Sequence, residues 1–317
     1  MDLTAIVESV TECSKHKRDM VIPMTELYPT LLPTGLDVGL RLGNKGDPKP
    51  LTDSGLSSFL HKLAIPTLLY KKCSPKLKLD LMSEFHLKQI QERASNKPLF
   101  VRLFKENVRF VGSGDYGKID DIDVVGALTK ITTQLKYTGF EQTEDCFTLR
   151  ALTETPIQID GLRPYFPGIQ IVNSEVGKSR LKIQLILVEQ VCTNGMVSGV
   201  FARAFGRVHK HTVQAADLVS ESAKMIARID AFALWAQEHM AKFINIPGKA
   251  LMNRIQEDRD ISKEIKDKTV ELLPKYSRAD SWNNPLDVVS AFTEAIQVRP
   301  RLERIRLEAF AGELISL

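Results

Sequence analysis

Helical periodicity in the hydrophobic positions marks several stretches of the chain. Over residues 52–63 apolar side chains recur at spacings of three and four, and Thr52 or Asp53 can cap the start. Residues 77–91 carry a second helical pattern. From residue 212 to 244 the same period continues and predicts a long amphipathic helix.

A further helix is expected after residue 119. Asp120 or Asp121 can cap its amino end, and apolar residues continue on one face as far as Leu135. Gly139 stands where a C-terminal cap would be needed. The pattern therefore predicts one helix across this whole stretch.

Alternating and β-branched runs predict strands between these helices. A Lys105-Glu106-Asn107 turn joins the first two runs into a hairpin, and Asn194-Gly195 favours a second hairpin, since Asn-Gly tolerates positive φ. The predicted strands are residues 99–104, 108–111, 146–152, 168–173, 180–192 and 196–205.

Together these elements predict an α+β fold with a central antiparallel β-rich core, hairpins, flanking helices and a long amphipathic helix after the core. Residues 1–50 are rich in turn formers and are expected to be a loosely organised lead-in. Residues 51–245 would form the core domain, and residues 246–317 a helical region packed on it.

Composition places the chain among ordinary globular proteins. Its 317 residues are 43% hydrophobic and 26% charged, and no apolar run is long enough to cross a bilayer. The amino terminus has no apolar segment of the secretory kind. The four cysteines are scattered without a CxxC pair, which fits a reducing compartment. We expect a soluble protein of the host-cell cytoplasm that does not contact membranes.

Charge is unevenly distributed along the chain. The formal net charge is only +4, but residues 162–211 hold seven bases against two acids, a local net of 7 − 2 = +5. A clustered excess can bind phosphates. Lysine and arginine on solvated strand faces are the alternative explanation.

Basic and aromatic side chains also interleave along the first predicted hairpin, as in proteins that bind single strands. Strand alternation means that some of these aromatics must belong to the core. The candidate nucleic-acid contacts are Arg102, Lys105, Arg109, Tyr116, Lys118, Lys178, Arg180, Lys182, Arg203, Arg207 and Lys210.

One motif resembles catalytic chemistry. Gly112-Ser113 followed by Asp121 and Asp123 is similar to the triphosphate turn and metal-binding pair of nucleotidyltransferases. Here the acids fall at a helix start, where capping of free amides is the favoured explanation. Cys192 with His209 is far more consistent with a buried cysteine than with a nucleophile and base. No catalytic residue, metal or cofactor is predicted.

Several blocks of the sequence form a distinctive set, and the two most specific are N-S-E-x-G at residues 173–177 and C-T-N-G-M at residues 192–196. The blocks are 51–54, 63–66 with Tyr70, 109–123, 171–177, 191–196 and 282–294. Together they resemble the phage/plasmid-like protein family, whose shared domain carries no assigned function. The resemblance covers about residue 50 to the end.

Such proteins are mobile-element cargo, for which handling of single-stranded DNA in replication or recombination is a frequent task. We therefore expect a non-enzymatic protein that binds, and can anneal, single-stranded DNA, with self-assembly into a homo-oligomer. A protein that acts on a host partner, for example against host defence, is the first alternative. A metal-dependent nucleotidyltransferase is the second.

Overall fold

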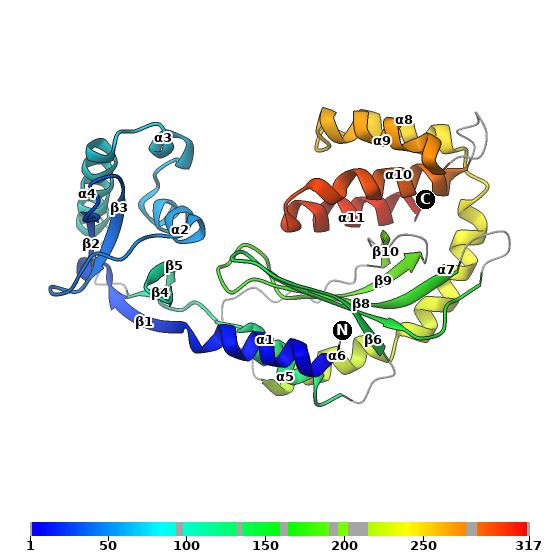
Figure 1. Ribbon diagram of the computed structural model, residues 1–317, viewed down its shortest axis with the longest axis horizontal. Helices are drawn as coiled ribbons and strands as arrows, with labels where there is room; N and C mark the ends of the chain where they lie inside the picture. The colour runs from blue at the N-terminus through cyan, green and yellow to red at the C-terminus, as the bar shows by residue number, and fades with distance from the viewer. Residues whose placement is uncertain are drawn as a thin grey trace.

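The computed structural model forms an elongated molecule with two lobes joined by extended chain (Figure 1). We call residues 17–113 the small lobe, and residues 2–16 with 114–315 the large lobe. The structure describes residues 2–92, 98–131, 135–158, 164–189, 196–201, 215–276 and 284–315.

The small lobe packs two antiparallel sheets against three helices. The first sheet has the order β1-β4-β5, and β2 pairs with β3 in the second. Helix α2 lies so close to β5 that a Cβ at Gly55 would meet the carbonyl oxygen of Val108, which restricts this position to glycine. The elements are β1 (Lys17–Pro23), η1 (Met24–Glu26), β2 (Leu27–Leu31), β3 (Val38–Leu42), α2 (Asp53–Leu63), α3 (Thr67–Lys71), α4 (Pro75–Glu92), β4 (Pro98–Phe104) and β5 (Asn107–Ser113).

The large lobe is built on a five-stranded antiparallel sheet of order β10-β9-β8-β7-β6. Its strands are β6 (Leu135–Gln142), β7 (Phe147–Thr153), β8 (Tyr165–Asn173), β9 (Lys182–Glu189) and β10 (Met196–Phe201).

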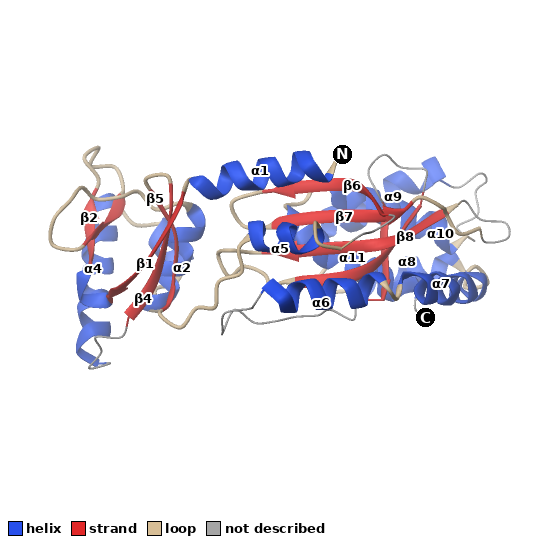
Figure 2. Cartoon of the chain, turned by 90° about the horizontal axis from the view of Figure 1, so that it is seen from below, coloured by secondary structure: helices blue, strands red, loops and turns tan. Residues whose placement is uncertain are grey.

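Helices cover both faces of this sheet (Figures 1 and 2). On one side lie α1 (Leu3–Lys15), α5 (Asp121–Leu128), α6 (Ala215–Ile226) and α7 (Ile229–Phe243). On the other lie α8 (Gly248–Glu257), α9 (Lys263–Tyr276), α10 (Pro285–Ala295), η2 (Ile296–Val298) and α11 (Arg301–Ile315).

The two sheet faces differ in chemistry because successive strand residues point to opposite sides. Phe147, Leu149, Ile171 and Ile183 contribute to the main apolar core. The opposite face carries polar side chains at the end nearer the small lobe, and α11 lies across it.

The α+β prediction is confirmed. The helix capped by Thr52 is present as α2, the helix over residues 77–91 as α4, and the 99–111 hairpin as β4 and β5. The four later strands lie within a few residues of their predicted bounds. The stretch 215–243 is helical, as expected, but in two consecutive helices that meet at Ala227 and Arg228.

Two expectations differ from the structure. Residues 1–50 are not a loose lead-in, because they form α1 and three strands whose residues enter both apolar cores. The apolar clusters consequently divide at about residue 113 rather than at residue 50. The predicted helix to Leu135 is also wrong: α5 ends at Leu128, and Leu135 begins β6, where pairing with β7 overrides the helical pattern.

Among the described residues, no helix combines the length and apolar character that crossing a membrane requires.

Candidate nucleic-acid interface

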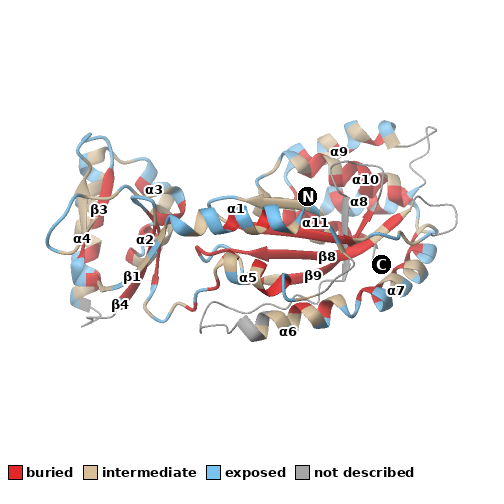
Figure 3. Ribbon diagram, turned by 60° about the horizontal axis from the view of Figure 1, so that its bottom comes forward, coloured by how far each residue is buried: buried red, intermediate tan, exposed pale blue. Residues whose placement is uncertain are grey.

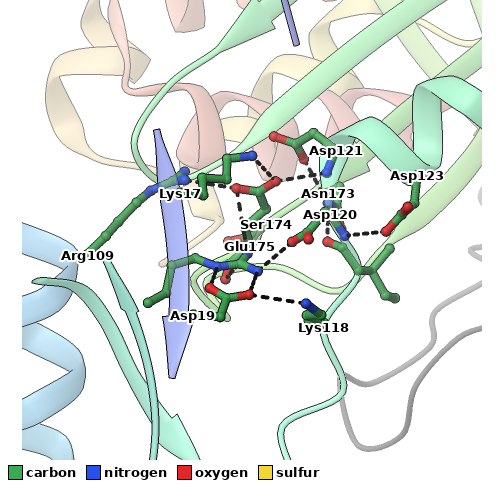
Figure 4. Close-up of polar contacts among 12 residues, drawn as sticks. Lys17, Asp19, Arg109, Lys118, Asp120, Asp121, Asp123, Asn173, Ser174 and Glu175 are labelled. Carbon is green, nitrogen blue, oxygen red and sulfur yellow. Dashed lines mark hydrogen bonds and ion pairs between the residues drawn. The ribbon is translucent and has the colours of Figure 1, made fainter. Parts of the chain in front are cut away.

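A buried ion network joins the two lobes, and its centre is Glu175, in the connection from β8 to β9 (Figure 4). The side chain of Glu175 is fully buried. Lys17 Nζ lies 2.5 Å from its Oε1, and Arg109 Nη1 lies 2.8 Å from its Oε2. Arg102 Nη1 is 3.7 Å from the same Oε2. Although burial opposes it, the charges of Lys17, Arg102 and Arg109 hold the pKa of Glu175 below its ordinary value.

Arg102 is one of the most buried side chains of the protein, at 1% exposed. Its Nε and Nη2 each donate to a carboxylate oxygen of Asp19 at 2.8 Å, the bidentate arrangement that guanidinium geometry favours. Asp120 Oδ1 lies 2.6 Å from Nη2. Arg102 and Arg109 were predicted to contact nucleic acid, but both are buried among protein acceptors and present no free guanidinium to a phosphate.

Asp121 extends the network toward the large-lobe sheet. Its backbone N–H donates to Glu175 Oε1 at 2.9 Å, and its carboxylate accepts from Asn173 Nδ2 at 2.8 Å and from Gln142 Nε2 at 2.9 Å. Burial first, and then the charge of Glu175, raise the pKa of Asp121 to about 7. Asp121 thus has a buried structural carboxyl group whose pKa lies close to neutral pH.

Helix capping explains the positions of Asp120 and Asp123, and capping was the explanation that the sequence favoured over metal binding. Asp120 is the N-cap of α5, and the carboxylate of Asp123 accepts from the Asp120 N–H at 3.4 Å. The described part of the chain contains no group of three side chains arranged to hold a metal ion. The oxygens of Asp121 and Asp123 are used within the fold, so this pair offers no support for the transferase hypothesis.

A second set of contacts reinforces the junction from the β6–β7 turn. The N–H of Ser54, in the first turn of α2, donates to Glu144 Oε1 at 3.0 Å. Arg109 Nη2 donates to the Glu144 carbonyl at 2.7 Å, and Ser174 Oγ to the Asp145 carbonyl at 2.5 Å. Three of the family-like blocks, 51–54, 109–123 and 171–177, therefore meet here.

Tyr116 packs into an aromatic cluster rather than onto an open surface. Its ring stacks on Phe100 with centroids 5.3 Å apart and lies 4.8 Å from the ring of Phe110. Burial raises the pKa of the Tyr116 phenol. Gly177 adopts a φ of +70° beside the same rings. Tyr116 is the only aromatic residue among the predicted contacts, and most of its ring surface is therefore buried against Phe100 and Phe110 and is not available for base stacking.

The remaining described candidates reach solvent. Lys178 and Arg180 are exposed in the loop that follows Glu175, and Lys182 is half-buried at the start of β9. Lys118 is 51% exposed with Nζ 3.3 Å from Asp19, and Lys105 is exposed at the turn of the β4–β5 hairpin with a φ of 54°. Arg203, Arg207 and Lys210, with Cys192 and His209, lie outside the described residues.

The exposed loop contacts a second basic segment that the sequence analysis did not single out. Lys178 Nζ donates to Ser57 Oγ on α2 at 3.2 Å. Residues 54–79 contain no acid and five lysines, and residues 176–188 contain no acid and three bases. A search for acid-free windows would have found both segments, whereas their contact depends on the fold. The bases are Lys62, Lys71, Lys72, Lys76, Lys78, Lys178, Arg180 and Lys182.

No protein-family model, curated protein or solved structure matches this chain.

Proposed function

We propose that this protein binds single-stranded nucleic acid through the basic loop 176–182 and the adjoining helices of the small lobe. The observation that carries the proposal is the contact of two acid-free basic segments, made at Lys178 and Ser57. Lys78 is paired with Asp37 at 3.4 Å, whereas Lys178 and Arg180 are exposed. The charges of such exposed bases can contact phosphates, which dominate the affinity of such complexes.

The proposal includes the biological setting that the sequence blocks suggest. A mobile-element protein of the host cytoplasm that holds or anneals single-stranded DNA would use an exposed basic loop of this kind. Self-assembly along a strand would multiply weak contacts by raising the effective concentration of each binding loop.

A fluorescence titration with a labelled single-stranded oligonucleotide tests the proposal at low and at moderate salt. We expect a Kd below about 10 µM at low salt, tighter than the roughly 100 µM end of non-specific affinity, and weaker binding as salt rises because counterions are released. Absence of binding at low salt would refute it. A double-stranded oligonucleotide of the same sequence serves as the comparison ligand.

A protein partner is the second candidate, because α3 and the start of α4 expose large apolar side chains. Leu68 is 79% exposed, Leu69 51% and Leu77 52%. Single exposed leucines are ordinary, but neighbouring ones are typical of contact surfaces. Affinity purification with the wild type and with a Leu68→Asp/Leu69→Asp variant discriminates: a stoichiometric host protein lost with the variant favours this function, whereas recovered nucleic acid favours the first.

A further inference from the structure

The polar face of the large-lobe sheet holds a second cluster of cations, beneath the first turn of α11. Strand pairing places Glu141, Thr148, Val172 and Lys182 in one row across β6, β7, β8 and β9. The next row on this face contains Arg150, Gln170 and Gln184. Helix α11 adds Arg301, Arg304 and Glu308 from above.

Arg301 is the exceptional member of this cluster. Its side chain is 9% exposed. Its Nε is fixed by Thr148 Oγ1 at 3.1 Å and by Glu141 Oε2 at 3.3 Å. Within the described part of the chain, no acceptor is recorded for its two terminal nitrogens. The guanidinium group of Arg301 is therefore nearly buried and fixed through Nε, and its Nη1 and Nη2 atoms are positioned to donate hydrogen bonds to a ligand.

The neighbouring charges leave this cluster positive. Arg150 donates to both oxygens of Glu308 at 2.8 Å, and Arg304 donates to Glu141 at 2.9 Å. The two carboxylates are thus engaged by two arginines, while Arg301 shares Glu141. Burial first, and then the charge of Arg150, lower the pKa of Arg301 to about 10, which leaves it cationic at neutral pH.

Lys182 adds a further cation to the same face. It lies two strands from Thr148 in the cross-sheet row, a separation of about 10 Å at the usual strand spacing. No carboxylate partner of its ammonium is recorded among the described residues. Figure 3 shows α11 and the sheet that it covers from a third direction.

We propose that Arg301 and Lys182 form a binding site for one phosphate group, with the nearby charge of Arg150 adding to the positive potential. A tetrahedral oxyanion matches the planar fork of an arginine, which donates two parallel hydrogen bonds to it. The site shares Lys182 with the end of the basic loop, but Arg301 lies outside that loop, and Lys178 and Arg180 lie outside this site. A nucleic-acid backbone and a free phosphorylated compound present the same group.

Calorimetric titration with inorganic pyrophosphate at fixed ionic strength tests this site. We expect saturable binding by the wild-type protein, weakened about tenfold or more by Arg301→Gln, since a hydrogen bond to a charged group is removed. Arg301→Lys, which keeps the charge without the fork, should fall between. Arg306→Gln is the matched control, because Arg306 is exposed on the same helix.

Two results of the pyrophosphate titration would overturn the proposed phosphate site. Absence of saturable binding by the wild type, or equal losses in Arg301→Gln and Arg306→Gln, overturns the site. If Arg301→Gln does not fold by circular dichroism, the Arg301→Lys comparison decides in its place, and unchanged affinity in that variant overturns the site.

A parallel titration with a single-stranded oligonucleotide identifies the source of the phosphate. Loss of oligonucleotide affinity in the Arg301 variant assigns it to the nucleic-acid backbone, and an unchanged affinity assigns it to a free phosphorylated compound. A Lys178→Ala/Arg180→Ala variant should retain pyrophosphate binding, so that failure of the proposed function and failure of this site give different results.

Discussion

Glu175 and Lys178 are three residues apart in the chain and belong to two different parts of the molecule. Around Glu175, Lys17, Arg102 and Arg109 are buried together with acids from both lobes. Around Lys178, Lys178 and Arg180 face solvent, and the two segments that meet at Ser57, residues 54–79 and 176–188, contain no acid.

This contrast shows that residue type and local net charge do not distinguish a structural cation from a binding one. A buried ion pair has lost its hydration, so each partner depends on the other, whereas an exposed lysine keeps its charge for a ligand. We therefore assign fold stability to the first group and propose ligand binding for the second.

The largest effect is expected from Glu175→Gln. It removes the common acceptor of Lys17 and Arg109 and leaves buried positive charge without compensation. We expect the free energy of unfolding to fall by about 3–5 kcal/mol, a large part of the usual total. Urea unfolding followed by circular dichroism measures it. A loss below about 1 kcal/mol would show that the network does not hold the lobes together.

Asp121→Asn should change how stability depends on pH. The pKa of Asp121 is raised in the folded state, to about 7, from an ordinary value of about 3.9. The folded protein therefore binds this proton more tightly, and its contribution to stability decreases as pH rises from about 4 to 7. Unfolding measured at intervals from pH 5 to 8 should show a wild-type decrease that the variant lacks. Parallel curves for the two proteins would contradict the assignment.

The smallest effect is expected at the helix cap. Asp123→Ala removes the carboxylate that accepts from the Asp120 N–H, and Asp123 is not part of the Glu175 contacts. A loss of about 1 kcal/mol is expected. Thermal unfolding checks it, with Glu257→Ala, an exposed residue at the end of α8, as the control. A loss as large as that of Glu175→Gln would erase the distinction between cap and network.

Local patterns predicted much of the fold, because caps, helical spacing and turn residues act within a few positions. Thr52 and the Lys105 turn are examples that the structure confirms. Leu135 and Gly139 were misassigned because pairing with β7 decides their conformation. No local signal could show that Arg102 meets Asp19 across 83 positions, or that Arg301 lies over Thr148 across 153. Of the candidate contacts, the sequence therefore predicted exposure only for those in or next to turns and loops, namely Lys105, Lys118, Lys178 and Arg180.

The most direct test compares two triple variants in oligonucleotide titrations at several salt concentrations. One is Lys178→Ala/Arg180→Ala/Lys182→Ala, and the other removes three exposed lysines elsewhere: Lys242→Ala/Lys249→Ala/Lys263→Ala. The account predicts that the first loses affinity at least tenfold and lowers the salt slope by about 2, at roughly 0.7 per lost phosphate contact. Both variants should keep the wild-type melting temperature within a few degrees. Equal affinity losses in the two variants would contradict the account, because binding would then follow total charge rather than the exposed loop.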